Sequence, residues 1–207
     1  DAFELSGYGE WRQPGAGGAG SVYARLARLQ LPVQAAGEVE QLLQQPRSVP
    51  ALDITVDDLA LGEQRLGRFE VQAVNQGASG NARVWQLNRL QATLPEARFT
   101  ATGRWAADPQ ADKDKPLRRA SMAFTLDVAD SGALLARFGR PGTVRGAKGS
   151  IVGQLNWLGS PLSLDYPSLS GQLKADFERG QFLKVEPGAA KLLGVLSLQA
   201  LPRRLAL

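Results

Sequence analysis

The chain has 207 residues, of which 43% are hydrophobic and 21% are charged, a balance typical of one or two folded domains. It contains no cysteine and no histidine. Disulfide bonds and thiolate chemistry are therefore excluded, and zinc, haem and histidine-dependent catalysis have almost no candidate residues. We expect this chain not to be an enzyme and to need no cofactor or metal ion.

The N-terminal part contains a glycine pattern that suggests a cofactor site. Gly15, Gly17 and Gly20 have the G-x-G-x-x-G spacing of a dinucleotide-binding loop. Such a loop follows a buried parallel strand and opens directly into a helix. Here the flanking stretches, "AFELSGYGEW" and "SVYARLARLQLP", both alternate between apolar and polar residues. We interpret the glycines as a loop between two strands, with no nucleotide bound.

The next segment, "AAGEVEQLLQQPRSVP" at 35–50, is expected to be a linker or a short helix. It divides the chain into residues 1–34, the end of a preceding β-segment, and residues 51–207. Because the chain begins at Asp1, inside an alternating pattern and without a methionine, we expect it to be a piece of a longer protein.

From residue 51 onward, a period of two predicts one strand after another. Glycine-containing turns between the strands indicate an antiparallel meander. In the first strand, "ALDITVDDLAL", the apolar phase shifts at Asp57 and Asp58, which predicts a β-bulge. These adjacent carboxylates point to opposite faces of a strand and are expected to be solvated, not catalytic. The predicted strands lie in 51–61, 65–74, 97–105, 121–128, 150–157 and 168–181.

Two later stretches read as short helices. The first is "DSGALLARFGRPG", in which Asp130 or Ser131 is a candidate N-cap and Gly139 and Pro141 end the helix. The second covers 187–199 and opens with Pro187. Its apolar residues are expected to pack onto the sheet, namely Leu192, Leu193, Val195 and Leu196.

A net charge of +4 raises nucleic acid and anionic lipid as partners. The arginines are scattered and are not interleaved with aromatic residues in a nucleic-acid-binding motif, and they would suit anionic lipid headgroups equally well. Charge alone does not choose between the two partners; our overall expectation is that no nucleic acid is bound. No apolar run approaches the roughly 18 residues that a membrane-spanning helix requires.

The C-terminal third carries a long, specific motif, "GQFLKVEPGAAKLLGVLSLQALPRRL", at 180–205. The upstream blocks "LDITVDDLALGEQRLGRFEVQA", "ATGRW", "DSGALLARFG" and "GQLNWLGSPLSL" accompany it. Together they resemble the AsmA-like envelope proteins of the YhdP family. The resemblance covers 52–207 well and the first fifty residues only loosely.

This resemblance implies a periplasmic portion of a Gram-negative protein anchored in the inner membrane. Such proteins are similar to bridge-like lipid transporters, whose repeated β-groove conducts phospholipids between the inner and outer membranes and supports the permeability barrier. The implied partners are phospholipid acyl chains, flanking segments of the same long chain, and the membrane through regions outside this fragment. The implied fold is mainly β: a long twisted antiparallel meander curled into an open apolar groove, with two or three short helices.

The apolar positions of the predicted strands are the candidate groove lining. They are Ile54, Val56, Val71, Phe99, Phe124, Leu126, Ile151, Leu155, Leu173 and Phe177. Periodicity alone also allows these residues to form an ordinary closed core. Two other functions remain open: an assembly scaffold that binds envelope partners through exposed sheet edges, and a carboxylate-based glycan hydrolase.

Overall fold

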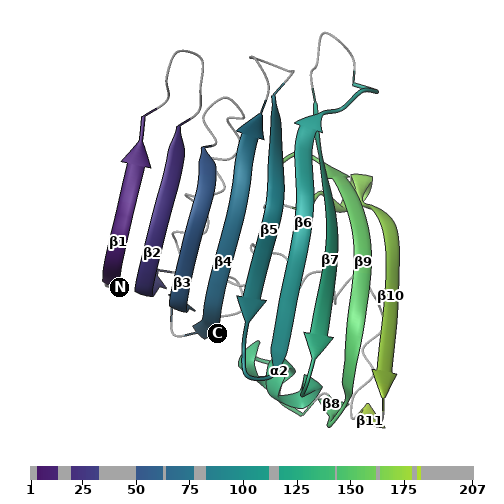
Figure 1. Ribbon diagram of the computed structural model, residues 1–207. Coiled ribbons are helices and arrows are strands. Elements are labelled where there is room, and N and C mark those ends of the chain that lie inside the picture. The colour runs from purple at the N-terminus through teal and green to yellow at the C-terminus, as the bar shows by residue number, and fades with distance from the viewer. Residues whose placement is uncertain are drawn as a thin grey trace.

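The computed structural model describes residues 4–13, 20–32, 50–62, 64–76, 83–111, 117–142, 144–161, 164–178 and 181–182. Nine strands form one sheet whose spatial order follows the chain almost completely (Figure 1). The strands are β1 Glu4–Arg12, β2 Ser21–Leu31, β3 Ala51–Leu61, β4 Gln64–Gln76, β5 Val84–Thr93, β6 Ala97–Ala107, β7 Arg118–Val128, β9 Lys148–Leu158 and β10 Ser170–Glu178.

The sheet is open, because β1 and β10 lie at its two ends and do not pair with each other. Figure 1 shows the sheet curving across its width toward β9 and β10. A separate two-stranded sheet pairs β8 Val144–Arg145 with β11 Gln181–Phe182. The expected mainly β fold with an open, curved sheet is confirmed.

One pairing departs from a simple antiparallel meander. Strands β2 and β3 are parallel, with Ala24 opposite Ile54 and Leu26 opposite Val56, whereas the other neighbours in the sheet are antiparallel. Parallel neighbours need a long connection that returns to the starting end of the sheet. The segment 35–50, expected to be a linker or short helix, lies outside the described residues except for Pro50. It connects β2 and β3, which pair within one sheet.

Local predictions about the strands hold. Arg12 pairs with Ser21 in the antiparallel β1–β2 pair, so the glycine stretch between them joins two strands of a hairpin and does not precede a helix. The register between β3 and β4 shifts between Val56 and Leu59, which is where the sequence predicts a bulge.

The predicted helix after β7 is present as α2 Ser131–Arg137, at one end of the sheet (Figure 1). Asp130 is its N-cap, and the carboxylate of Asp130 accepts a hydrogen bond of 3.0 Å from the backbone N–H of Ala133. A 3-10 turn, η2 Tyr166–Ser168, precedes β10. The predicted helix at 187–199 lies outside the described residues.

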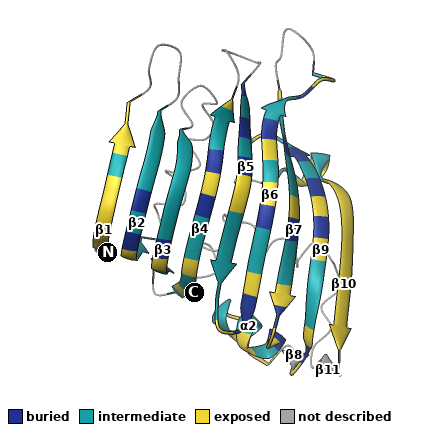
Figure 2. Ribbon diagram, viewed as in Figure 1, coloured by how far each residue is buried: buried dark blue, intermediate teal, exposed yellow. Residues whose placement is uncertain are grey.

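The core lies on one face of the sheet. A larger cluster extends from β4 to β9 around Phe124, Leu155 and Trp157, and a smaller one joins β2 and β3 around Leu26 and Val56. Buried and exposed residues alternate along the central strands, while β1 and β10 are mainly exposed (Figure 2). The sheet therefore has one apolar face, one polar face and two exposed edges.

Candidate functional site

The candidate site is the apolar face, which the strand register builds from residues on every strand. Residues directly opposite each other on paired strands point to the same side of a sheet. One row of paired residues runs Gly9, Ala24, Ile54, Val71, Leu90, Ala101, Phe124, Gly153 and Leu173. The next row runs Gly7, Leu26, Val56, Phe69, Ala92, Phe99, Leu126, Ile151 and Ala175.

The structure places every candidate lining residue on this face. Most of them belong to the two rows above. Leu155 lies in the adjacent row, opposite Met122 and Gly171, and Phe177 lies opposite Gly149 at the far end of β10. The alternation along each strand was sufficient to find these residues. Their contact with lipid remains a prediction.

Exposure varies strongly across the apolar face. In its middle, Val56, Phe124 and Leu155 are only 1%, 3% and 5% exposed. At the β10 margin, Leu173 and Phe177 are 44% and 42% exposed. The middle is packed like a core, whereas the margin at β10 presents apolar side chains to the surroundings.

Glycines on this face make room for the large side chains beside them. A Cβ atom on Gly153 would lie 2.5 Å from Cε1 of Phe124 and 2.6 Å from Cδ2 of Leu173. A Cβ atom on Gly149 would lie 2.6 Å from Cδ1 of Phe177. The aromatic rings therefore lie low over β9, and Phe124 also stacks on Phe99 with ring centroids 5.7 Å apart.

One end of the apolar face is lined by tryptophans. Trp85 on β5, Trp105 on β6 and Trp157 on β9 are all buried and belong to the same cluster. Each indole N–H donates to a backbone carbonyl just outside the strands: to Pro50 at 3.1 Å, to Gly159 at 2.7 Å and to Ser160 at 2.7 Å, respectively. No pattern in the sequence singles out this tryptophan end. Only the register shows that three residues so far apart in sequence meet at one end of the sheet.

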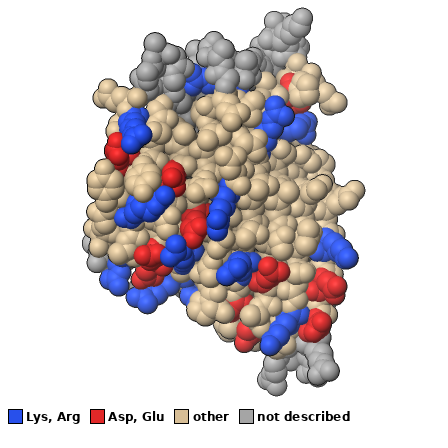
Figure 3. All heavy atoms as spheres, viewed as in Figure 1, with Lys and Arg blue, Asp and Glu red and all other residues tan. Residues whose placement is uncertain are grey.

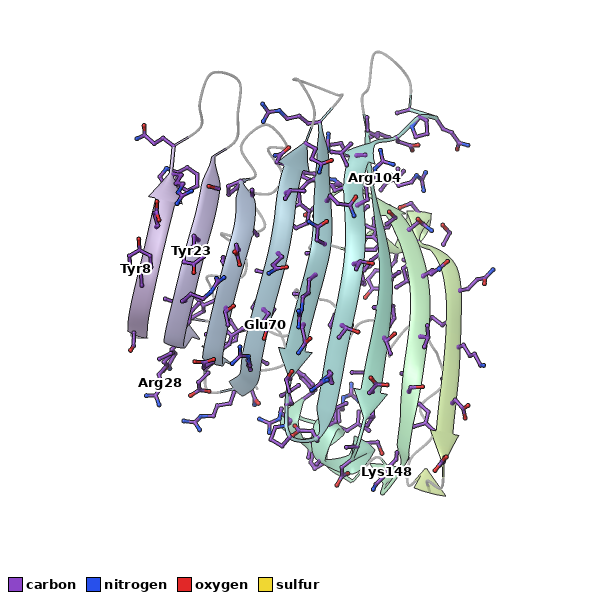
Figure 4. The ribbon with its side chains drawn as sticks, viewed as in Figure 1. Tyr8, Tyr23, Arg28, Glu70, Arg104 and Lys148 are labelled. Atoms are coloured by element: carbon purple, nitrogen blue, oxygen red, sulfur yellow. The ribbon has the colours of Figure 1, made fainter. Side chains whose placement is uncertain are left out.

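The opposite face is polar and carries ion pairs between neighbouring strands. Arg68 contacts Asp57 at 2.7 Å and Glu70 at 2.8 Å, and Arg25 contacts Asp53 at 2.9 Å. The hydrogen bond from Arg68 is the main reason why the pKa of Glu70 lies below its usual value. In Figure 3, which views this face, positive and negative side chains lie next to each other. The labelled Tyr8, Glu70 and Arg104 mark the same face in Figure 4.

A depression of about 330 Å³ on the polar side includes Arg25, Thr55, Asp57 and Arg68 in its lining. Its charged groups are already paired, Arg68 with Asp57 and Arg25 with Asp53, so it resembles a solvated surface more than a ligand site. Within the described ranges, no group of three or more acidic residues is placed to hold a metal ion. In the same ranges, no helix is long and apolar enough to cross a membrane.

A comparison with protein families matches the entire chain, residues 1–207, to the family described as YhdP protein. The chain belongs to the YhdP family. The match includes the first fifty residues, where the resemblance in sequence was only loose. Comparisons with curated proteins and with solved structures found no match.

The YhdP motif at 180–205 is described only at 181–182, where β11 pairs with β8. The expected packing of Leu192, Leu193, Val195 and Leu196 onto the sheet therefore lies outside the described residues. In this YhdP-family chain, the candidate functional site therefore consists of the lining of the apolar face and its tryptophan end.

Proposed function

We propose that this chain is a segment of a periplasm-spanning, bridge-like protein that conducts phospholipids between the inner and outer membranes of a Gram-negative cell. In this proposal the protein supports the outer-membrane permeability barrier and is anchored in the inner membrane by regions outside residues 1–207. It performs no catalysis and needs no cofactor. Acyl chains of phospholipids lie on the apolar face.

The observation that carries this proposal is the continuity of the apolar rows from one edge of an open sheet to the other. A row such as Ile54, Val71 and Phe124 contains no charged or polar side chain on any of the nine strands. Burial of a methylene group contributes about 0.8 kcal/mol regardless of its orientation. Such a surface holds acyl chains without fixing their position, which is what sliding along a conduit requires.

The two exposed edges support the same proposal. Within the part of the chain that the structure describes, β1 and β10 each have one sheet neighbour, and β10 is exposed at every residue. Exposed edges are normally paired or protected, because their backbone groups are ready to bind another strand. In a longer chain built of repeated β-segments, the flanking segments would pair with these edges and extend the apolar face.

The test uses charges placed at the open margin of the face. Leu173 is 44% exposed, so Leu173→Asp should leave the lipid-free fold nearly as stable as wild type. An acyl chain over that position would have to desolvate the carboxylate, and each 1.4 kcal/mol of that cost lowers binding about tenfold. Gln172→Asp is the matched control, since it adds the same charge to the same strand on the polar face.

We expect lipid co-purifying with the full chain, measured by mass spectrometry, to fall about tenfold in Leu173→Asp and to be unchanged in Gln172→Asp. In cells, detergent sensitivity of the outer membrane should increase only with Leu173→Asp in the full-length protein. Equal lipid content in the two folded variants would contradict the conduit proposal.

The exposed edges also favour a second candidate, a periplasmic scaffold that binds envelope partners by strand addition. Strand addition depends mainly on main-chain hydrogen bonds. A scaffold would therefore tolerate both Leu173→Asp and Gln172→Asp, with the outer-membrane barrier intact in both. The same pair of variants thus distinguishes the two candidates.

A further inference from the structure

The tryptophan end of the apolar face contains a half-buried cation. Arg118 is the first residue of β7, and its Cζ atom lies 4.5 Å from the centre of the Trp105 ring. Its Nη2 atom donates to the carbonyl oxygens of Trp105 at 2.8 Å and Arg83 at 3.0 Å. Ala120, two residues further along β7, pairs with Trp105. The guanidinium therefore lies on the apolar side of the sheet and reaches from β7 past β6 to the start of β5.

This guanidinium has no carboxylate partner among the described residues. Its Nε atom is buried without any hydrogen-bond partner, and both of its hydrogen bonds use Nη2. Burial lowers the pKa of Arg118. The contrast with other arginines is clear: Arg119 pairs with Asp108 at 3.0 Å, and Arg137 pairs with Glu96.

An unpaired buried donor is costly, by about 1–3 kcal/mol and by more when it is charged. An anion at Arg118 would remove this cost, and a guanidinium offers several donors in the geometry that phosphate oxygens accept. Nη1 is the donor that such an anion can reach first, while Nε is buried and would be satisfied only if the guanidinium shifts toward the anion.

The surroundings of Arg118 define what kind of anion fits. The indoles of Trp85, Trp105 and Trp157 turn their rings to the apolar cluster and their N–H groups to backbone carbonyls. Tryptophans with one apolar and one polar side are typical of the level at which lipid headgroups meet acyl chains. The rows of apolar side chains begin directly beyond them.

We propose that Arg118 binds the phosphate of a phospholipid whose acyl chains lie on the apolar face. The inference rests on the proposed conduit function and adds a binding site for the lipid headgroup to it, at the tryptophan end. The phosphate is held at Arg118 beside Trp105, and the tails extend from there over the apolar rows. The apolar face alone would accept any acyl chain, so Arg118 gives the segment a preference for anionic phosphate headgroups.

The test compares lipids with identical tails. Binding of the full chain to dioleoyl phosphatidic acid and to dioleoylglycerol is measured in detergent solution, with glycerol 3-phosphate as a ligand without tails. We expect wild type to bind phosphatidic acid about tenfold more tightly than dioleoylglycerol. Arg118→Met should abolish this preference and leave the affinity for dioleoylglycerol unchanged.

Arg104→Met is the matched control, because it removes the same charge next to Trp105 but from the polar face (Figure 4). It should keep the preference. Arg118→Lys retains the charge with fewer donors and should keep part of it. The comparison of the two lipids in wild type needs no variant, so the test does not depend on the folding of Arg118→Met.

The outcomes separate this inference from the function on which it rests. If wild type binds both lipids equally, or if Arg118→Met keeps the preference, the headgroup site is refuted while the conduit stands. If glycerol 3-phosphate binds as tightly as phosphatidic acid, the site is one for free phosphate and the lipid assignment is wrong. If neither lipid binds, the conduit proposal itself fails.

Discussion

The close contact between Gly153 and Phe124 predicts the effect of a single methyl group. In Gly153→Ala the new Cβ atom would lie 2.5 Å from Cε1 of Phe124 and 2.6 Å from Cδ2 of Leu173, whereas ordinary contacts of this type are about 3.4–4 Å. Leu173 is 44% exposed and can swing away. Phe124 is 3% exposed, so its ring can move only by disturbing the core, at a cost of about 1–3 kcal/mol.

A matched glycine isolates this cost. Gly9 lies in the same row on β1, and a Cβ atom there would be 3.9 Å from the nearest atom, the carbonyl oxygen of Tyr23. Replacing glycine by alanine also stabilises a protein by about 0.4–1 kcal/mol through the unfolded chain. That contribution is common to Gly153→Ala and Gly9→Ala and cancels in their difference. Gly153→Ala should therefore be about 1–3 kcal/mol less stable than Gly9→Ala.

Urea unfolding followed by far-UV circular dichroism measures this difference, and thermal unfolding should show a drop of roughly 2–4 °C for each 1 kcal/mol. Phe124→Leu introduced together with Gly153→Ala should recover part of the loss, since the smaller side chain clears the new methyl group. Equal stability of Gly153→Ala and Gly9→Ala would refute the reasoning, because it would mean that Phe124 is not confined against β9.

Two further predictions concern the end of the sheet at α2. Arg137 donates to Glu96, whose side chain is 6% exposed, and this hydrogen bond is the main reason why the pKa of Glu96 lies below 4.5. A lowered folded pKa gives stability that is complete above the unfolded pKa and is lost as the pH falls through the folded value. Glu96→Gln should thus lower the free energy of unfolding by about 3 kcal/mol at neutral pH. In urea unfolding, this loss of stability should become smaller below pH about 4.5, where Glu96 of the wild type becomes protonated. A loss that does not depend on pH would contradict the ion pair. Asp130→Ala removes the N-cap of α2 and should lower the stability of the protein by about 0.5–2 kcal/mol, while Asp130→Asn should lower it much less. If both variants lost the same stability in thermal unfolding, the capping hydrogen bond of Asp130 would not be the cause of the loss.

Most of the strands and the composition of the apolar face were accessible from the sequence because they depend on local chemistry, although β5 Val84–Thr93 was not among the predicted strands. The period of two at Phe124 and Leu126, or at Leu173 and Phe177, assigns these residues to one side of a strand whatever the strand pairs with. The bulge after Val56 was accessible in the same way, from a shift of phase. Asp130 could be recognised as a cap because its hydrogen bond closes within three residues.

The parallel pairing of β2 with β3 was not accessible, because both strands have the same alternation in either direction. Only the course of the connecting chain and the competition among registers decide the direction. The tryptophan end was missed for a related reason. Trp85, Trp105 and Trp157 each continue the apolar alternation of their own strand, so nothing local distinguishes them from core residues.

The sequence by itself therefore determined that this chain makes a mainly β sheet with one apolar face, since side-chain alternation and turn chemistry act over a few residues. The tertiary structure alone decided which residues meet across that sheet. It set Phe124 against Gly153, and it brought Arg118 over Trp105 with no carboxylate partner among the residues that the structure describes. Register and burial are properties of the complete set of strand pairings, and a buried charge acquires its meaning only from neighbours that the pairing brings to it.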